Sequence, residues 1–447
     1  MSYLSHSEED RQYMLSALGM KDEQELFDGI PEVLRIKGLN IPNGISEFEV
    51  SKLLEEKASR YDTSLTSYLG GGIYNHIIPS VVDYISSRGE FYTAYTPYQP
   101  EASQGTLQSL FEYQTAVCEL TGMEVSNASM YDGSTALAEA ILMALRIKRK
   151  KSRIVISETV NPIYRSVCKT YLNHIGTSID EVSADDVLNN PQAILDSIDD
   201  DTAAVVVQNP DFFGNIHDLS KLFSALKEKG IICIQVFYPI SLGLIQSPGE
   251  AGADIAVADG QSLGMPLSFG GPYLGILTTT RKHLRKIPGR IAGETTDTEG
   301  QRGYVLTLQA REQHIRREKA TSNICSNQGL CALRALIFLS TIGPKGLEQI
   351  AVNCYDKTQY LIGKLREISC IKIENTQPVF NEFTFSTPVP ARELTERMLK
   401  KGIAAGLTLG NFYSGKDNTI LTACTEKHTK QDLDTYVNII SEELAHE

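Results

Sequence analysis

The chain has 447 residues, of which 42% are hydrophobic, and this length fits a large α/β domain with one or two smaller parts. Its formal net charge of −13 gives no general attraction to nucleic acid or to an anionic membrane, so we expect small molecules and other proteins as partners, and neither nucleic acid nor a membrane. An acidic N-terminus without an apolar leader, and the lack of about 18 consecutive apolar residues anywhere, predict a cytoplasmic protein.

Residues 1–60 contain short helical patterns that Pro31, Pro42 and several glycines interrupt. Interrupted patterns of this kind fit an arm that lies across another surface better than they fit a core. We therefore predict a helical N-terminal arm over residues 1–60.

Residues 61–330 alternate between short apolar runs and amphipathic helical patterns such as 218–230. Such alternation is typical of a mainly parallel sheet covered by helices on both faces. A further helical pattern ends at Gly122, which is placed as a C-terminal cap. The apolar runs predict strands at Arg153–Ser157, Ala203–Pro210, Ile231–Phe237, Ala253–Asp259 and Leu274–Thr280.

From residue 331 the composition changes to a long helical pattern over 331–343, followed by shorter elements. Apolar runs at Asn381–Ser386 and Leu421–Thr425 predict strands, and the patterns over 391–402 and 431–444 predict helices. Residues 331–447 are therefore expected to form a smaller α+β domain.

Three segments contain more glycine, aromatic or charged residues than structure alone requires. The first consists of Tyr68–Ser80 together with the loop Phe91–Thr106, because tyrosine hydroxyls on a rigid loop commonly line pockets or interfaces. An ordered crossover loop packed on its own domain is the alternative. The candidate residues in this loop are Tyr95, Thr96, Pro97, Tyr98 and Gln99.

The second segment is the helix start at Gly133, Ser134 and Thr135. Free backbone N–H groups and small hydroxyl residues at a helix N-terminus form a ready anion site, but the same residues also make an ordinary cap. The sequence leaves both interpretations open.

The third segment is Gly293–Gly329, which concentrates positive charge in an otherwise acidic chain. It is either a solvated helix face or a site for an anionic ligand or an acidic partner protein. Its charged side chains include Arg311, His314, Arg316, Arg317 and Lys319. The eight cysteines show no CxxC pair and no Cys/His spacing suited to zinc, so we expect reduced core thiols and no metal site.

The loop DGQSLGMPLSFGGPYLG, Asp259–Gly275, lies between two predicted strands. In α/β enzymes of the aminotransferase type, a loop in this position holds the lysine that binds pyridoxal phosphate. This loop contains no lysine. It therefore raises the question of whether the chain has lost its own cofactor chemistry.

Three long runs together resemble the glycine cleavage system P-protein family: YTPYQPEASQGTLQSLFEYQTAVCELTGMEVSNASMYDGSTALAEA, GQSLGMPLSFGGPYLG and REQHIRREKATSNICSNQ. The resemblance covers nearly the whole chain and is strongest for the first (alpha) subunit of bacterial enzymes that are split in two. It implies a fold type I pyridoxal-phosphate-dependent transferase fold, similar to aspartate aminotransferase. It also implies a heterodimer with a homologous second subunit, arranged as a dimer of heterodimers.

The reaction that the resemblance implies is that of glycine dehydrogenase (aminomethyl-transferring), EC 1.4.4.2, an oxidoreductase of glycine catabolism. Glycine is decarboxylated and the aminomethyl group passes to the lipoyl arm of H-protein. In this arrangement the second subunit carries the lysine and the pyridoxal phosphate, and the first subunit binds no cofactor.

The residues of this chain support the assignment of the lysine and the cofactor to the second subunit. The positions that match the lysine are Gln261 and Ser262, with Ser262 taken as the replacement, and neither side chain can form an imine. The segment Ile231–Gly243 contains no acid for the cofactor ring, and Gln235 or Tyr238 stands in its place. Tyr238 departs from the family, which tends to read DPLSLG here. Gly133, Ser134 and Thr135 are then a relic phosphate cup or a cap.

Active sites of this fold lie at the subunit interface, so the resemblance implies that this chain lends residues to its partner. The lent groups would exclude water, position the glycine carboxylate and guide the lipoyl arm. The candidates are Tyr95, Thr96, Pro97, Tyr98, Gln99, His314, Lys319, Ser322 and Asn323. Two alternatives stay open: a structural scaffold that lends nothing, and a free-standing pyridoxal-phosphate enzyme that uses Lys319.

Overall fold

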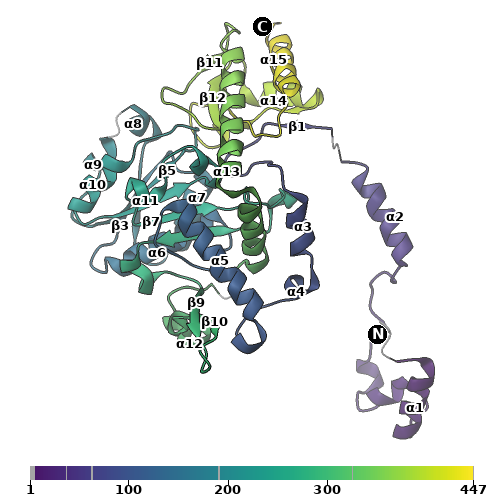
Figure 1. Cartoon of the computed structure of the whole chain (residues 1–447). Coiled ribbons are helices and arrows are strands. Elements are labelled where there is room, and N and C mark those ends of the chain that lie inside the picture. The colour runs from purple at the N-terminus through teal and green to yellow at the C-terminus, as the bar shows by residue number, and fades with distance from the viewer. Residues whose placement is uncertain (1–5, 37, 62–63, 190–191, 325, 446–447) are drawn as a thin grey trace. The chain divides into compact units, whose positions relative to one another are not determined.

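The structure is a computed structural model of the chain and describes residues 6–36, 38–61, 64–189, 192–324 and 326–445 (Figure 1). The chain divides into two compact units, Met1–Thr63 and Ser64–Glu447. The boundary near residue 60 that the sequence suggests lies close to this division. No comparable division falls at residue 330, where the sequence predicts a second boundary.

The first unit consists of short helices, and both of its α-helices begin at capping boxes. Ser7 and Asp10 form a capping box at α1 (Glu8–Leu18), and Ser46 and Glu49 form another at α2 (Glu47–Ala58). The two 3-10 helices between them are η1 (Glu23–Phe27) and η2 (Glu32–Leu34). Leu15 is the one buried side chain in the helices of this unit, so the unit has local caps but little core of its own.

The second unit is built on a seven-stranded sheet with the order β2-β8-β7-β6-β5-β3-β4. Five neighbouring strands, from β7 to β4, run parallel, while β8 is antiparallel to β7 and β2 to β8. The sheet is therefore mainly parallel, as the sequence predicts. The strands are β2 (Val125–Ser126), β3 (Arg153–Ser157), β4 (Ser178–Val182), β5 (Thr202–Asn209), β6 (Ile232–Phe237), β7 (Ile255–Asp259) and β8 (Gly275–Thr279).

Helices cover both faces of this sheet. On β3, Ile154 and Ile156 pack in one hydrophobic cluster with α6 and α7, whereas Val155 packs in another with α10. Gly122 ends α5 in the left-handed conformation, with φ 65°, as expected of a C-terminal cap. The helices of this region are α3 (Ser80–Ser86), α4 (Gly89–Tyr92), η3 (Pro100–Ala102), α5 (Gln104–Thr121), α6 (Gly133–Ile147), α7 (Pro162–Leu172), α8 (Ala184–Asn189), α9 (Ala193–Asp196), α10 (Ser220–Glu228), η4 (Pro239–Gly243), α11 (Pro248–Ala251), η5 (Ser268–Gly270) and η6 (Arg281–Lys286).

The positively charged segment 293–329 is not a long helix. It begins in an antiparallel hairpin of β9 (Ile291–Thr296) and β10 (Arg302–Thr307) and continues in three short turns. The turns are η7 (Gln309–Arg311), α12 (Gln313–Arg316) and η8 (Arg317–Lys319). All side chains of 313–319 are exposed, so this run is solvated, but on short helical turns and not on the face of one long helix.

The long helix α13 (Gly329–Leu365) connects the large sheet to the C-terminal part. It breaks at Gly343, where φ is 60°, and continues from Pro344. By length and composition α13 could cross a membrane, and 33% of its apolar window is buried within the protein, where its buried side chains belong to the cores. The predicted helix over 331–343 is thus the first half of a longer element.

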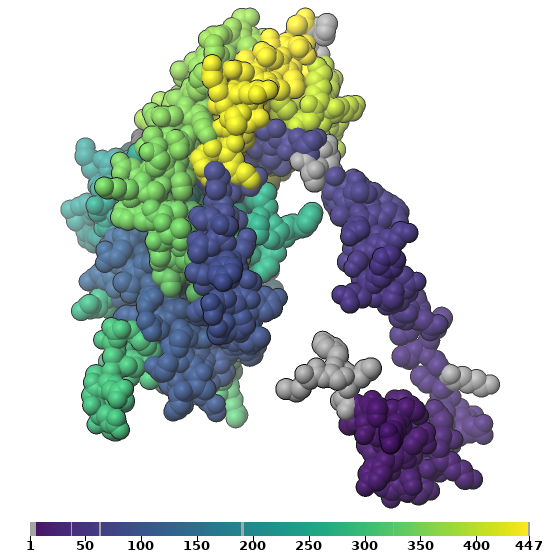
Figure 2. Space-filling view, turned by 45° about the vertical axis from the view of Figure 1, so that its right-hand side comes forward, coloured from purple at the N-terminus to yellow at the C-terminus, as the bar shows by residue number. Residues whose placement is uncertain are grey.

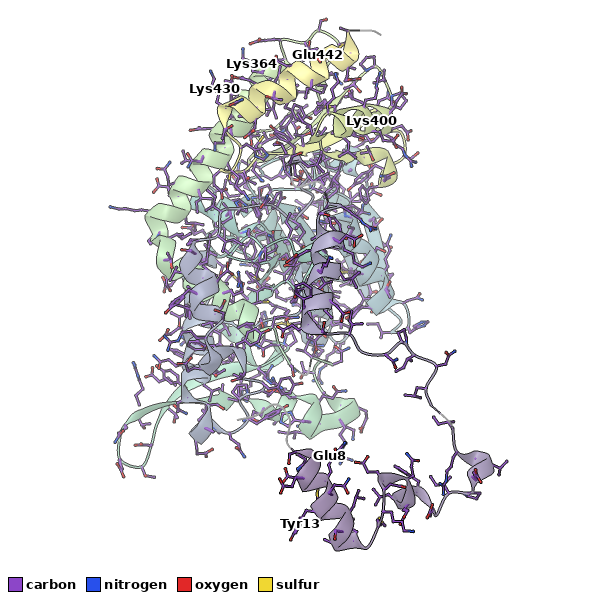
Figure 3. All side chains as sticks on the ribbon, turned by 90° about the vertical axis from the view of Figure 1, so that its right-hand side faces the viewer. Glu8, Tyr13, Lys364, Lys400, Lys430 and Glu442 are labelled. Atoms are coloured by element: carbon purple, nitrogen blue, oxygen red, sulfur yellow. The ribbon has the colours of Figure 1, made fainter. Side chains whose placement is uncertain are left out.

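The C-terminal residues, yellow and yellow-green in Figure 2, gather at one end of the second unit and contain a second, smaller sheet with helices. This four-stranded antiparallel sheet has the order β11-β12-β15-β14, and β13 pairs in parallel with β1. Figure 3 shows Lys364, Lys400, Lys430 and Glu442 on the outside of its helices. The elements are β1 (Thr66–Ser67), β11 (Lys372–Ile373), β12 (Glu382–Ser386), α14 (Ala391–Lys400), β13 (Ile403–Ala404), β14 (Leu407–Thr408), η9 (Leu409–Asn411), β15 (Thr419–Ala423) and α15 (Lys430–Leu444).

The cysteines largely follow the expectation of core thiols. Cys118 is half-buried and Cys370 is exposed, so Cys370 is not a core residue. Cys325 lies outside the described residues. The buried free cysteines are Cys168, Cys233, Cys331, Cys354 and Cys424.

Candidate functional site

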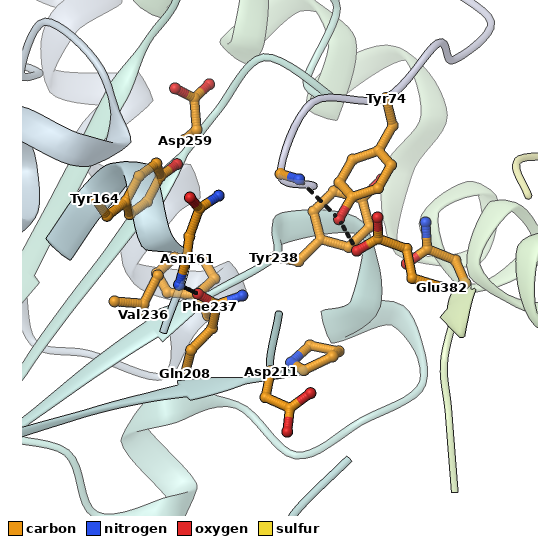
Figure 4. A pocket seen from close by; sticks show the side chains of 13 residues that line it. Tyr74, Asn161, Tyr164, Gln208, Asp211, Val236, Phe237, Tyr238, Asp259 and Glu382 are labelled. Atoms are coloured by element: carbon orange, nitrogen blue, oxygen red, sulfur yellow. Dashed lines mark hydrogen bonds between the residues drawn. The ribbon is translucent and has the colours of Figure 1, made fainter. Parts of the chain in front are cut away.

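A small cavity lies at the carboxyl ends of the parallel strands, where open α/β sheets bind their ligands (Figure 4). Its volume is about 30 Å³. Ligand pockets usually measure roughly 300 to 1,000 Å³, and a single water needs roughly 10 to 15 Å³. The cavity therefore has room for water but not for a cofactor. It is lined by Gly72, Tyr74, Asn161, Tyr164, Gln208, Pro210, Asp211, Val236, Phe237, Tyr238, Asp259, Asn381 and Glu382.

The N-terminus of α6 bonds two carboxyl groups of the chain itself, and one of them, that of Asp259, lines this cavity. The backbone N–H of Gly133 donates to Oδ2 of Asp259 over 3.0 Å. Asp132 is the N-cap residue, and its Oδ1 accepts from the backbone N–H of Thr135 over 2.9 Å and from the hydroxyl of Ser134. The helix start that the sequence marks as a cap or a phosphate cup is thus a cap, with Asp132 and Asp259 as its acceptors.

Asp259 is almost completely buried, and burial raises the pKa of its carboxyl to about 7. Hydrogen bonds from the backbone N–H groups of Gly133 and Gln261 oppose the shift without cancelling it. The space around Gly133 is tight, because a Cβ there would come within 2.3 Å of the Tyr164 hydroxyl. Little room is left at this helix end for a second anion.

Two tyrosines whose rings are tilted against each other also line the cavity. The rings of Tyr74 and Tyr238 lie 4.4 Å apart between centroids. The Tyr74 hydroxyl donates to Oε2 of Glu382 over 2.6 Å (Figure 4). The backbone N–H of Gly71 donates to Oε1 of the same carboxyl over 2.6 Å. Burial raises the pKa of Glu382 to about 7. The carboxylates around the cavity are therefore bound by donors of the chain itself.

Tyr238, one of the two residues expected in place of a ring-binding acid, lines the cavity and bonds elsewhere. Its hydroxyl makes a short hydrogen bond to Nε2 of His76, whose Nδ1 lies 2.7 Å from Oε2 of Glu426. Cys354 completes a group of three possible metal ligands with His76 and Glu426. Both ring nitrogens of His76 already have protein partners. Gln235, the other candidate, is buried and does not line the cavity.

Gln261 and Ser262 differ in what their side chains touch. Oε1 of Gln261 accepts from the backbone N–H of Tyr74 over 3.0 Å, and its Nε2 donates to the carbonyl of Met265 over 2.8 Å. The hydroxyl of Ser262 is buried and has no hydrogen-bond partner among the described residues. Of the two positions that match the lysine, Gln261 is the one in contact with the cavity wall.

Four of the nine residues expected to be lent to a partner, Tyr95, Thr96, Tyr98 and His314, lie together on a second feature of this unit. The Ser326 hydroxyl donates to the Tyr95 hydroxyl over 3.2 Å and lies 3.3 Å from that of Thr96. The rings of Tyr98 and His314 meet edge to face, with centroids 5.1 Å apart. Two segments more than 200 residues apart in sequence therefore form one surface, which we call the Tyr95–His314 face.

The other candidates are placed differently. Pro97 is buried, while Gln99, Lys319 and Asn323 are exposed. The hydroxyl of Ser322 points inward and donates to Oε1 of the buried Glu139 on α6 over 2.7 Å. Arg290 and Glu312, which the sequence interpretation did not single out, lie beneath the Tyr95–His314 face. No spacing rule marks a buried arginine, and only the contact with Tyr98 reveals it.

The sheet order, the helix layers and the C-terminal part define a class of protein: the fold type I pyridoxal-phosphate-dependent transferases. A crystal structure of glycine decarboxylase (P-protein) of the glycine cleavage system, in inhibitor-bound form, superposes with a TM-score of 0.90. It is 39% identical and the match covers 99% of this chain and 100% of that one. Glutamate decarboxylase of Lactobacillus brevis shares the fold at a TM-score of 0.69 and 12% identity, over 93% of this chain and 96% of its own.

A family model described as glycine cleavage system P-protein matches residues 1–440, and the chain belongs to that family. A protein of Citrifermentans bemidjiense named probable glycine dehydrogenase (decarboxylating) subunit 1 is 51% identical over 99% of this chain and 100% of its own length. One of Geotalea uraniireducens with the same name is 54% identical over 97% of this chain and 98% of its own length.

Proposed function

We propose that the chain is subunit 1 of a split glycine dehydrogenase (decarboxylating), and that it works without a cofactor of its own. With a homologous second subunit it decarboxylates glycine and passes the aminomethyl group to the lipoyl arm of H-protein. Near full-length similarity to proteins named subunit 1 supports this assignment. The same names imply a partner subunit.

The small size of the cavity is the observation that supports our proposal that the partner subunit binds pyridoxal phosphate. Its volume of about 30 Å³ is far below that of a cofactor pocket. Asp259 already occupies the helix end that would bind a phosphate, and Asp211 and Glu382 add negative charge. None of the described lining residues is a lysine or an arginine. The residues present therefore do not fit this cofactor.

The contribution of this chain to catalysis is then the Tyr95–His314 face. Tyr95 is 86% exposed and Tyr98 is 43% exposed, and both hydroxyls belong to an ordered network. Exposed tyrosines with fixed hydroxyls suit contact with a partner's site, where they exclude water and orient a carboxylate. Lys319 lies on an exposed turn of charged residues and not in the loop that follows β7, so the free-standing enzyme is disfavoured.

The assembly and location complete the proposal. The chain pairs with the second subunit as a heterodimer, two of which form a dimer of heterodimers, and the complex receives lipoylated H-protein. It acts in the cytoplasm. The calculated net charge of −13 is in keeping with partners that are proteins and small molecules.

The test is reconstitution with the catalytic subunit and measurement of glycine decarboxylation per bound pyridoxal phosphate. We expect activity only when both subunits are present. Tyr95→Phe and Tyr98→Phe should each lower turnover per cofactor by roughly ten- to hundredfold, the effect of losing a hydroxyl that bonds a charged group. Assembly, checked by size, should be unchanged.

Tyr413→Phe is the matched control, because this tyrosine also contacts a buried arginine, Arg165, but at another place in the fold. It should keep full activity per cofactor. If Tyr95→Phe and Tyr98→Phe do so as well, the chain is a structural scaffold at this face.

A further inference from the structure

A fully buried arginine lies directly beneath the Tyr95–His314 face. Arg290 precedes β9 and is 1% exposed, and it is among the largest fully buried side chains of the described chain. Arginine is almost never fully buried unless it is paired, because a buried charge without partners is costly. The groups that Arg290 contacts therefore indicate its role in the structure.

The Arg290 guanidinium touches both segments of the face. Its Nη2 donates to the Tyr98 hydroxyl over 2.8 Å, and its central carbon lies 4.9 Å from the centroid of the Tyr98 ring. Its Nη1 reaches the Thr96 hydroxyl at 3.4 Å. From the other segment, Oε2 of Glu312 accepts from Nε over 3.4 Å.

Glu312 extends this network to His314. Its carboxylate is buried, and Oε2 lies 3.7 Å from Nδ1 of His314, whose ring packs edge to face on Tyr98. The contacts thus form a closed circuit in which Arg290 and Glu312 are buried while Tyr98 and His314 reach the surface. The buried pair therefore contacts both exposed rings from beneath.

We propose that Arg290 is a positioning residue for glycine decarboxylation, which it affects by fixing Tyr98 against His314 without touching the substrate. This inference rests on the proposed function of the Tyr95–His314 face. It assigns Arg290 a role that lysine cannot fill, because the planar guanidinium bonds a hydroxyl and a carboxylate in fixed directions while it stacks on a ring. A lysine keeps the charge but has no such fork.

The experiment uses the complex with the catalytic subunit and compares Arg290→Lys, Tyr98→Phe and the double variant. Arg290→Lys should lower kcat per bound cofactor roughly tenfold, with cofactor content and assembly unchanged. Because Arg290 acts through Tyr98, the double variant should be less than about twofold slower than the slower single variant.

Arg165→Lys is the matched control. Arg165 is also buried, pairs with Glu181 over 2.9 Å and lies 5.7 Å from the ring of Tyr413, so its loss tests the general effect of altering a buried arginine. It should change thermal stability about as much as Arg290→Lys does but leave kcat per cofactor unchanged.

Two outcomes overturn the inference. If Tyr98→Phe slows the reaction but Arg290→Lys does not, or if the two effects multiply, Arg290 has no positioning role while the proposed function stands. If Tyr95→Phe and Tyr98→Phe are both fully active, the proposed function of the face fails, and the role of Arg290 fails with it.

Discussion

The carboxylate of Asp259 accepts a hydrogen bond of 3.0 Å from the backbone N–H of Gly133, at the first turn of α6. A helix N-terminus attracts anions through its free N–H groups and its dipole. Here the backbone N–H group binds a carboxyl of the same chain, that of Asp259 at the end of β7. The first backbone N–H group of α6 is thus already bound to a carboxyl of the same chain.

The pH dependence of stability should reveal this buried carboxyl. Its folded-state pKa of about 7 lies above the unfolded value of about 3.9, so the folded state binds more protons between these two values. The free energy of unfolding should therefore fall as pH rises from about 4 to 7, by on the order of 1.4 kcal/mol per unit of pKa shift. Glu382, shifted in the same direction, adds to the slope.

Asp259→Asn keeps the shape and one acceptor oxygen but cannot ionise, so it should flatten this slope. Urea titrations across that pH range measure it, with Glu101→Gln, an exposed site, as the control for net charge. An unchanged slope in Asp259→Asn would show that the carboxyl does not titrate in this window.

Pyridoxal phosphate should form no stoichiometric covalent adduct with a lysine of the isolated chain. After incubation with excess cofactor and reduction with borohydride, we expect no stoichiometric pyridoxyl-lysine, because the cavity of about 30 Å³ admits no cofactor and none of its described lining residues is a lysine. Peptide mass spectrometry provides the measurement. Full labelling of Lys319, or of any other single lysine, would contradict both the proposal and the closed cavity.

A lysine introduced at the matching positions should not restore an active site. Gln261→Lys removes two buried hydrogen bonds, to Tyr74 and Met265, and places an ammonium where no room exists. We expect Gln261→Lys and Ser262→Lys to lose roughly 1 to 3 kcal/mol of stability and to show no exchange of labelled bicarbonate into glycine. Measurable exchange of labelled bicarbonate into glycine by either variant alone would contradict this prediction.

Tyr74→Phe should destabilise the cavity wall. The Tyr74 hydroxyl bonds the buried Glu382 carboxyl over 2.6 Å, and its removal leaves that acceptor short of a donor at a cost of about 1 to 3 kcal/mol. Equilibrium unfolding in urea measures the loss. Tyr84→Phe, at a site that is 69% exposed, should change stability by less than about 0.5 kcal/mol. Equal effects of the two variants would count against the network.

The fold could be predicted wherever burial dominates the sequence. Strands such as Arg153–Ser157 and Ile232–Phe237 are apolar on both faces and stand out as continuous runs. Ser178–Val182 escaped prediction because it is an edge strand that alternates exposed and half-buried residues. The hairpin of β9 and β10 escaped too, since its outer half is charged and exposed.

The site was less predictable, because its contacts join distant residues. The tyrosine loop and the basic segment were both identified as candidates, but nothing in either indicates that they meet. Asp259 appears in the sequence as the end of a strand, and its bond to Gly133 spans 126 residues. The buried ion pair of Arg290 with Glu312 produces no periodic pattern in the sequence.

The long helix α13 has a practical consequence for anyone who wishes to divide this protein. Its first half supplies Cys331 and Phe338 to the core of the large sheet, and its second half supplies Leu361 and Leu365 to the core of the small one. A cut at residue 330 would remove the helix that completes the hydrophobic core of the large sheet, and no other part of that fragment could replace it. The two halves of the chain should therefore melt together in a single transition, and separately expressed fragments should fold only when mixed.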